Sequence, residues 1–319
     1  MTQLRPLAIA GPTATGKTVL AVELARRIGA ELINADSRQV SRRLRVGTAT
    51  PSATELRGVP CHLLDLCEPG APFTVADWLE RARTTLAGLR ASGIPAILVG
   101  GTGQYLRALR EGWGFGGAHP DEATRAQLTA VASAPGGLER LAAELHDRDP
   151  QGCASVDLAN PRRVIRALEL LRDGAASLAE ARRTAGGVEV DVVILDAERA
   201  IHADALDARM DAMFATGAMV AEVDEELSRG TTPAALRRAG IGYTEALALL
   251  DGAIGVEDAR AATLQRTRRY VKAQRTWFRH EPCVLRLERR ADTSTAALAD
   301  TVLTAVRLSP ATPGPGSRR

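Results

Sequence analysis

Residues 6–18 read PLAIAGPTATGKT, and this stretch decides the fold. Residues 6–10 form a short apolar run typical of a buried strand, and a helical pattern of apolar residues runs from Lys17 to about Ile28. The intervening GPTATGKT matches the pattern GxxxxGK[ST], which binds phosphate when it lies between a strand and a helix. Its backbone N–H groups and the helix N-terminus form a concave anion site. We therefore predict a phosphate-binding loop here.

Two side chains of this loop are suited to charged partners. The ammonium of Lys17 reaches the outer phosphates of a ligand, and the hydroxyl of Thr18 can hold Mg²⁺. We expect the loop to bind a diphosphate through Gly11, Pro12, Thr13, Ala14, Thr15, Gly16, Lys17 and Thr18.

Strands alternate with helices along the first part of the chain. Apolar runs at 30–35 and 94–99 predict two more strands, and an amphipathic helix is expected at 74–92. This alternation predicts an α/β fold of the P-loop NTPase kind, with a parallel sheet flanked by helices. Asp36 and Thr102 follow two of the strands, at the carboxyl edge where such sheets bind ligands. We predict Asp36 as a general base and Thr102 as a donor to phosphate, with a cap and a turn residue as the plain alternatives.

The sequence lacks the usual parts of a nucleotide hydrolase. The strand at 94–99 ends in Gly-Gly-Thr, where ATPases and GTPases usually carry an aspartate that holds the magnesium water. Neither an NKxD-like guanine-reading segment nor an arginine-rich lid of the nucleotide-kinase kind is present. The loop is therefore expected to bind diphosphate without hydrolysing a nucleotide.

The chain is expected to fold as a core interrupted by a helical segment. Only helical periodicity occurs at 121–184, and a lone strand at 188–195 precedes helices expected at 199–228, 233–250 and 256–280. The expected segments are a first part of the core at 1–120, a helical insertion at 121–184, a completion of the core at 185–308 and a disordered Pro/Gly-rich tail at 309–319.

Composition excludes several classes of protein. Hydrophobic residues at 45% and charged residues at 25% are ordinary for a globular protein and exclude a disordered or fibrous chain. No apolar run reaches the roughly 20 residues of a membrane helix, and the N-terminus lacks a signal-peptide layout. The four cysteines have no ligand-like spacing and are expected to be reduced thiols. We expect a cytoplasmic protein, with monomer as the default state.

Cationic residues gather near the C-terminal end of the sequence. From Arg260 to His280 there are seven Arg or Lys residues and no acid. Helical spacing places Arg268, Lys272, Arg275 and Arg279 on one stripe, and Leu264, Val271 and Phe278 on a neighbouring packed seam. The stripe is suited to a nucleic-acid backbone, although a solvated cationic face has the same pattern.

Seven blocks occur in a fixed order between about residues 6 and 280. They are GPTATGKT, ADSRQV with GTATP, HLLD, ILVGGTGQYLRAL, NPRRVIRALEL, GIGYTEAL and TRRYVKAQRTWFRH. In these blocks the sequence resembles the bacterial tRNA dimethylallyltransferases. That family transfers a dimethylallyl group from its diphosphate to N6 of adenosine 37 of tRNA, beside the anticodon.

The resemblance implies roles for the residues already singled out. Asp36 would accept a proton from the adenine amine, while Lys17, Thr18 with Mg²⁺, and Thr102 would stabilise the departing diphosphate. The implied partners are dimethylallyl diphosphate and the tRNA anticodon stem-loop, whose target base must leave its stack. The implied tRNA-binding residues are Asp36, Ser37, Arg38, Gln39, Thr102, Arg125, Arg162, Arg163, Arg166, Arg268, Lys272, Arg275 and Arg279.

Some positions depart from the family pattern, and other activities stay open. Ser41 stands where the family usually has Tyr, Thr50 and Ala239 replace a usual Lys and a usual Arg or Gln, and the family's KRQ reads Lys-Ala-Gln at 272–274. The alternatives are prenylation of free adenine nucleotides, a P-loop small-molecule kinase and a non-catalytic RNA-binding protein. His62 is expected to be a structural hydrogen-bonding residue.

Overall fold

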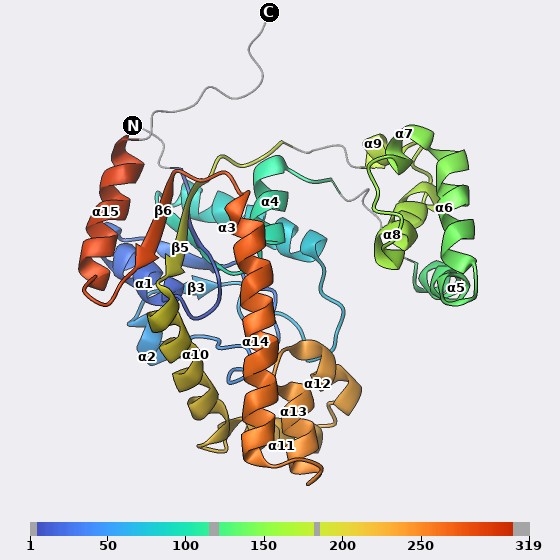
Figure 1. The fold of residues 1–319 in the computed structure, drawn as a ribbon. Helices are drawn as coiled ribbons and strands as arrows, with labels where there is room; N and C mark the ends of the chain where they lie inside the picture. Colours follow the sequence, from blue (N-terminus) through green and yellow to red (C-terminus); the bar gives the residue numbers. More distant parts are fainter. Residues whose placement is uncertain (1–4, 115–120, 182–185, 309–319) are drawn as a thin grey trace, which may run out of the picture. The chain divides into compact units, whose positions relative to one another are not determined.

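The computed structural model describes residues 5–114, 121–181 and 186–308 of the chain. It divides into two compact units (Figure 1). Unit 1 comprises Met1–Arg107 and Glu189–Arg319, and unit 2 comprises Ala108–Val188. The tail expected at 309–319 lies outside the described residues.

A six-stranded parallel sheet lies at the centre of unit 1, in the order β3-β2-β4-β1-β5-β6. Its strands are β1 (Leu7–Ala10), β2 (Glu31–Asn34), β3 (Cys61–His62), β4 (Ala96–Gly100), β5 (Asp191–Ala197) and β6 (Leu285–Arg289). On β1, Leu7 pairs with Ile97 of β4 and with Asp191 of β5, so the carboxyl ends of these strands share one edge. The predicted parallel α/β fold is confirmed.

The helices of unit 1 surround this sheet and form a helical cluster beside it (Figure 1). They are α1 (Lys17–Ile28), α2 (Ala53–Leu56), α3 (Val75–Ala91), α10 (Arg199–Phe214), α11 (Ala218–Ser228), α12 (Pro233–Ala239), α13 (Tyr243–Leu250), α14 (Val256–Arg279) and α15 (Thr295–Leu308). A capping box of Thr74 and Asp77 begins α3. On this helix the fully buried Trp78 donates its indole N–H to the carbonyl of Asn34 at 2.8 Å, which fixes α3 against β2.

The helical cluster departs from the expected element boundaries. The helix expected at 199–228 is two helices, α10 and α11, because Gly217 adopts a left-handed φ of 71° between them. The helix expected at 233–250 is likewise divided into α12 and α13, with Gly242 at a φ of 103°. The seam predicted on α14 is confirmed, since Leu264, Val271 and Phe278 are all buried.

One strand, at 188–195, was expected after the helical insertion, and the structure adds a second, β6. β6 pairs in parallel with β5, from Val193↔Leu285 to Ala197↔Arg289. Its side chains alternate between half-buried and exposed, and only Leu285 and Leu287 contribute apolar groups to the core of the sheet. So weak an alternation does not predict a strand by itself.

Unit 2 is helical in its described part. Its helices are α5 (Glu122–Ser133), α6 (Gly137–Arg148), α7 (Pro150–Cys153), α8 (Pro161–Arg172) and α9 (Leu178–Ala181), and α4 (Gly103–Glu111) crosses its boundary. The unit has its own apolar core, in which Leu145, Val164 and Leu168 are fully buried. Helix α8 begins at Pro161 after an Asn160 side chain that accepts the N–H of Arg162. Among the described helices of both units, none is long and apolar enough to cross a membrane.

Candidate active site at the phosphate loop

The predicted phosphate loop joins β1 to α1 at the carboxyl edge of the sheet. Gly11 has a φ of 144°, and a Cβ there would lie 2.0 Å from the carbonyl oxygen of Leu195 on β5, so only glycine fits. Ala14 has a left-handed φ of 61°, and Gly16 caps α1 with a φ of 92°. The predicted α1 from Lys17 to Ile28 is confirmed, so the helix N-terminus meets the loop as an anion site requires.

The side chain of Lys17 folds back onto the phosphate loop. Its side chain is buried and donates from Nζ to the carbonyl of Pro12 at 2.5 Å. The pKa of Lys17 is lowered to about 8, chiefly by burial; the carboxylates of Asp36 and Asp196 oppose this shift and the cation of Arg209 adds to it. An ammonium with few solvent contacts next to backbone N–H groups is suited to bind a multiply charged phosphate.

Asp36 follows β2 in a turn that its neighbours hold. Its backbone N–H donates to Asn34 Oδ1 at 2.9 Å, and its Oδ1 accepts the N–H of Arg38 at 2.9 Å. Asn34 in turn donates to the carbonyls of Asp36 and Leu63. Asp36 Oδ2 lies 3.5 Å from the place that a Cβ on Gly101 would take, so the carboxylate faces the turn after β4. One carboxylate oxygen thus caps the turn, and the other lies beside Gly101 in the turn that carries Thr102.

Thr102 lies in the turn after β4, next to Asp36 across the sheet edge. Its Oγ1 accepts the N–H of Ser37 at 2.9 Å and donates to Ser37 Oγ at 3.2 Å. Its N–H donates to the carbonyl of Ala35 at 3.2 Å. The structure therefore brings Thr102, Ser37 and Asp36 together, with Thr102 Oγ1 already bonded to Ser37.

Two residues that sequence reasoning missed complete the loop. Gln274 of α14 accepts the N–H of Thr13 at 2.9 Å and donates to the carbonyl of Gly101 at 2.9 Å. Arg209 of α10 donates to Thr13 Oγ1 at 2.9 Å and to the carbonyl of Gly47 at 3.0 Å, while its Nε is buried without a partner in the described part. Burial also lowers the pKa of Arg209. Both residues lie in helices far along the chain, where only the tertiary fold shows their place.

A neutral histidine lies on the other side of Thr13. His202 Nε2 lies 2.8 Å from the carbonyl of Thr13, and its Nδ1 lies 2.9 Å from the guanidinium of Arg275. A carbonyl needs a donor and a guanidinium needs an acceptor, so the proton is on Nε2. Burial lowers the pKa of His202, which agrees with this neutral form. Arg275 is held in turn by the carboxylate of Asp196 at 2.9 Å.

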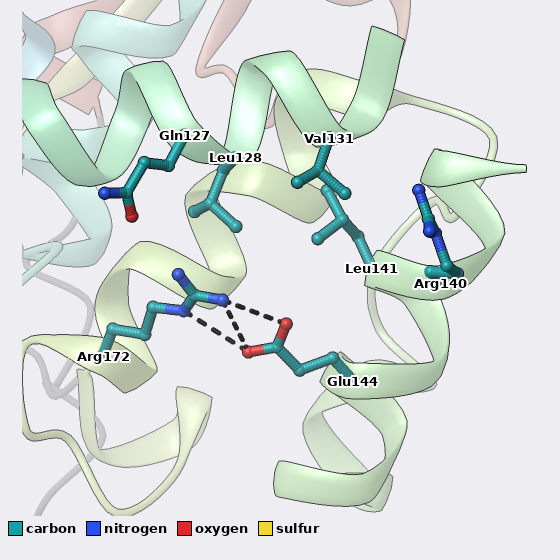
Figure 2. A pocket seen from close by; sticks show the side chains of 7 residues that line it. All are labelled: Gln127, Leu128, Val131, Arg140, Leu141, Glu144 and Arg172. Atoms are coloured by element: carbon teal, nitrogen blue, oxygen red, sulfur yellow. Dashed lines mark hydrogen bonds and ion pairs between the residues drawn. The ribbon is translucent and has the colours of Figure 1, made fainter. Parts of the chain in front are cut away.

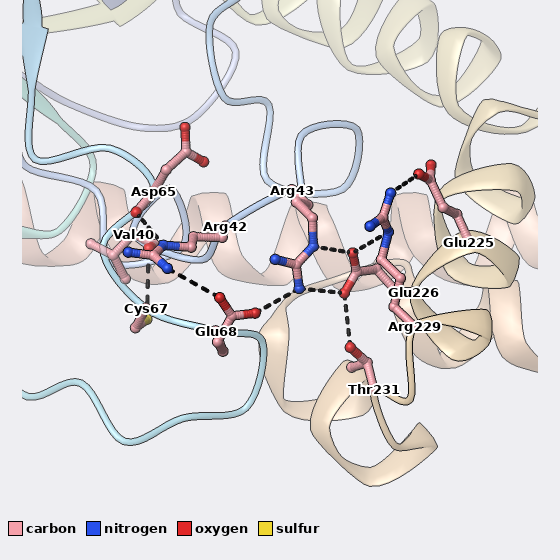
Figure 3. Close-up of polar contacts among 10 residues, drawn as sticks. All are labelled: Val40, Arg42, Arg43, Asp65, Cys67, Glu68, Glu225, Glu226, Arg229 and Thr231. Atoms are coloured by element: carbon pink, nitrogen blue, oxygen red, sulfur yellow. Dashed lines mark hydrogen bonds and ion pairs between the residues drawn. The ribbon is translucent and has the colours of Figure 1, made fainter.

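The chain after Asp36 is fastened to α11 and α13. Glu222 accepts the backbone N–H groups of Arg45 at 2.5 Å and Val46 at 2.7 Å, together with the hydroxyl of the buried Tyr243 at 2.7 Å. Nearby, Arg43 has a left-handed φ of 63° and pairs with the buried Glu226 at 2.6 Å (Figure 3). The segment between Asp36 and Gly47 is thus held by two carboxylates of one helix.

The chain is similar to known proteins over most of its length. A family model described as IPP transferase matches residues 39–281, and one described as isopentenyl transferase matches residues 5–66. The tRNA dimethylallyltransferase of Myxococcus xanthus (strain DK1622) is 40% identical over 286 residues, which cover 87% of this chain and 91% of that protein. That of Shouchella clausii (strain KSM-K16) is 38% identical over 282 residues, covering 88% and 90%. The chain belongs to the IPP transferase family.

A solved structure supports the same assignment. The full-length tRNA isopentenylpyrophosphate transferase from Bacillus halodurans is 32% identical, with a TM-score of 0.67, and covers 95% of this chain and 97% of that chain. The P-loop-like sheet of this IPP transferase is therefore a feature that it shares with its relatives.

Magnesium has one predicted ligand in this IPP transferase, Thr18 at the start of α1. The described residues contain no group of three or more His, Cys, Asp or Glu side chains suited to a metal. Mg²⁺ commonly keeps several waters and binds one or two protein groups together with substrate phosphates. A lone hydroxyl beside a phosphate loop fits a metal that enters with a diphosphate.

The predicted tRNA-binding residues near Asp36 also have roles within the protein. Arg38 donates to the carbonyls of Arg238 at 3.0 Å and Ala239 at 3.2 Å, at the end of α12. Gln39 donates to the carbonyl of Ala49 at 2.8 Å. These bonds connect the segment that follows Asp36 to α12 and to the GTATP segment.

Two of the four cations predicted to form a stripe on α14 have carboxylate partners from other elements. Arg275 pairs with Asp196, and Arg268 Nη2 lies 3.9 Å from Asp207 of α10. The helix is free of acids only along its own sequence, since neighbouring elements supply carboxylates. Lys272 and Arg279 are exposed and form no ion pair within the described residues.

In unit 2, most of the predicted tRNA contacts are ion pairs. Arg125 and Arg166 both bind Glu169, at 2.7 and 3.1 Å, and Glu169 is only 1% exposed. Arg163 lies 3.2 Å from Asp157, and Arg162 is exposed without a side-chain partner among the described residues.

A groove of about 400 Å³ lies on another part of unit 2 (Figure 2). It is lined by Gln127, Leu128, Val131, Arg140, Leu141, Glu144 and Arg172. Across it, Arg172 binds Glu144 through two nitrogens (Figure 2). Arg148 binds the same carboxylate. The Arg172 charge is thus neutralised within the groove.

His62 and Trp277 both have contacts within unit 1. His62 Nε2 lies 2.6 Å from Glu31, so the expected structural hydrogen bond is confirmed. Trp277 packs beneath the guanidinium of Arg107 at 4.3 Å from the ring centre, and its indole nitrogen is buried without a partner in the described part.

Proposed function

We propose that this enzyme transfers a dimethylallyl group from dimethylallyl diphosphate to N6 of adenosine 37 in tRNA, giving N6-(dimethylallyl)adenosine and diphosphate. One observation carries the proposal. The carboxylate of Asp36 and the hydroxyl of Thr102 lie at the same sheet edge as an intact phosphate loop, while β4 ends in Gly-Gly-Thr without a hydrolytic acid. Names of the relatives support the same reaction.

The reaction needs one bond formed, one bond broken and one proton moved. The adenine N6 attacks the allylic carbon, the carbon–oxygen bond to the diphosphate breaks, and the diphosphate leaves with the bonding electrons. Asp36 accepts the N6 proton, because its Oδ1 is already held by the N–H of Arg38 and its Oδ2 faces the site.

The departing diphosphate receives donors from several elements. The loop N–H groups, Lys17 and Arg209 lie on the side of Thr13, and Thr102 lies on the side of Asp36. Preorganised donors of this kind each contribute about 2.7–4 kcal/mol to transition-state stability. When bound, Mg²⁺ would neutralise further charge on the diphosphate, with Thr18 as its protein ligand.

We also propose that tRNA binds to exposed cations of both units. In unit 1 these are Arg268, Lys272 and Arg279 of α14, and in unit 2 they are Arg162 and Arg163 of α8, where helices α5 to α9 would bind the anticodon arm. Among them, Lys272, Arg279 and Arg162 have no ion pair among the described residues and can neutralise phosphates without breaking one, whereas Arg268 and Arg163 would exchange exposed pairs with Asp207 and Asp157.

The test is a transfer assay with labelled dimethylallyl diphosphate, Mg²⁺ and either tRNA or AMP as acceptor. We expect label in tRNA, and a loss of at least about a hundredfold in the rate with Asp36→Asn, the scale of a lost general base. Asp251→Asn, at an exposed position after α13, is the matched control and keeps its rate. Label in AMP would place the enzyme among those that prenylate free nucleotides. ATP consumption without transfer would show a kinase.

A further inference from the structure

The carboxyl end of β6 brings a cation to the phosphate loop. β6 is parallel to β5, and Arg289 is its last residue, paired with Ala197. The carbonyl of Arg289 accepts the N–H of Glu198 at 3.0 Å, which fixes its backbone at the same edge as the end of β1. Arg289 therefore reaches the loop from the side of the sheet that β5 and β6 form.

The side chain of Arg289 lies across the first turn of α1. A Cβ placed on Gly16 would stand 3.1 Å from Arg289 Nη1 and 3.8 Å from its Cδ. Gly16 is the N-cap of α1, so the guanidinium lies beside the N–H groups that a bound phosphate would meet. A side chain at position 16 would crowd this guanidinium.

Arg289 has no side-chain hydrogen bond or ion pair among the residues that the structure describes. The two nearby arginines do have side-chain partners. Arg290 pairs with Glu288 at 3.4 Å. Arg286 donates to the carbonyls of Phe278, Arg279 and Glu281. The half-buried, unpaired guanidinium of Arg289 and the positive N-terminal end of α1 therefore lie side by side. Both groups attract negative charge, so together they favour a bound anion.

We propose that Arg289 is a binding residue for the diphosphate, on the side of the loop opposite Asp36. The inference rests on the proposed function for the identity of that anion. In the sheet order, β4 and β2 with Thr102 and Asp36 lie on one side of β1, and β5 and β6 with Arg289 lie on the other. The adenine arrives beside Asp36, so the phosphate joined to the allylic carbon lies toward Asp36 and the terminal phosphate toward Arg289.

This placement assigns Arg289 a defined effect. As the carbon–oxygen bond breaks, negative charge grows on the diphosphate, and a guanidinium can donate two parallel hydrogen bonds to one phosphate. Arg289 would therefore hold the product diphosphate as well as the substrate. It makes no contribution to the proton transfer, which takes place on the other side of β1.

The test is calorimetric titration of the full chain with inorganic diphosphate in the presence of Mg²⁺. We expect Arg289→Ala to weaken diphosphate binding about tenfold or more, the scale of a lost charge-assisted hydrogen bond, and Arg289→Lys to restore part of it. Arg290→Ala removes an equal charge from the adjacent exposed position and changes the dissociation constant less than about twofold. Thermal unfolding and tRNA affinity of Arg289→Ala stay at the wild-type values.

Several outcomes would overturn the inference. Wild-type binding of diphosphate by Arg289→Ala would do so, and so would equal losses in Arg289→Ala and Arg290→Ala, which would indicate a general charge effect. A loss of tRNA affinity alone would make Arg289 a tRNA contact. Because inorganic diphosphate is the probe, a chain that binds it but transfers nothing to tRNA would contradict the proposed function and leave the Arg289 comparison intact.

Discussion

The side-chain oxygen of Gln274 accepts the backbone N–H of Thr13 at 2.9 Å. The nitrogen of the same amide donates to the carbonyl of Gly101, so a single residue of α14 joins the phosphate loop to the turn that carries Thr102. The helix that presents cations to solvent therefore also sets the spacing between the diphosphate site and the base.

Gln274→Glu should impair diphosphate binding more than it impairs folding. The substitution retains an acceptor for Thr13, but it removes the donor to Gly101 and adds a negative charge beside an anion site. We expect the KM for dimethylallyl diphosphate to rise about tenfold or more. Steady-state kinetics give the value, and Gln265→Glu at an exposed position of the same helix is the control. An equal effect of the two substitutions would contradict a specific role for Gln274.

Diphosphate affinity should fall as the pH rises through the pKa of Lys17. Burial lowers that pKa to about 8 in the free enzyme, so the ammonium is present below pH 8 and is lost above it. Because the anion binds the protonated form, the association constant is expected to decrease up to about tenfold per pH unit above 8.

Titration of Lys17→Met over the same pH range is the control for this dependence, since diphosphate itself also changes protonation. The difference between wild type and Lys17→Met isolates the contribution of Lys17. A constant difference from pH 6 to pH 9.5 would show that Lys17 does not titrate there.

Arg125→Ala and Arg162→Ala should affect different properties of unit 2, the first its stability and the second its binding of tRNA. Arg125→Ala leaves the buried Glu169 with Arg166 as its remaining partner, and we expect a loss of about 1–3 kcal/mol of unfolding free energy. Arg162→Ala removes an exposed cation and should weaken tRNA binding without lowering stability. Chemical denaturation and tRNA filter binding on both variants make the measurement, and a stable Arg125→Ala would contradict the prediction.

The two kinds of cation on α14 should differ in their salt dependence. Lys272→Ala and Arg279→Ala each remove an exposed charge, and each should lower the slope of log affinity against log salt for tRNA by about 0.7–1. Arg275→Ala instead releases Asp196 and His202 beside Thr13, so it should raise the KM for dimethylallyl diphosphate. An unchanged salt slope in Lys272→Ala and Arg279→Ala would remove α14 from the tRNA surface.

Local pattern was sufficient for the first part of the site. The strand, glycine-rich turn and helix around Lys17 are encoded within the 22 consecutive residues 7–28, so the sequence predicts them directly. Asp36 and Thr102 follow apolar strands, and parallel pairing brings such strand ends together.

Residues that depend on distant partners could not be predicted. Arg209 lies in a helix with an ordinary polar pattern, and its burial beside Thr13 arises only when α10 packs on the loop. Arg275 belongs by spacing to an outward stripe, but a carboxylate from β5 captures it. Arg289 ends a strand whose alternation is too weak to detect, so neither the strand nor its cation could be placed.

Glu222 bears on how inhibitors of this enzyme could be sought. It accepts the N–H groups of Arg45 and Val46 and the hydroxyl of Tyr243, so a carboxylate of the enzyme itself holds the segment that leads to Gly47. Arg209 joins this segment to the phosphate loop, because it donates to both Gly47 and Thr13. Fragment screening against unliganded crystals can therefore use this segment as a rigid template.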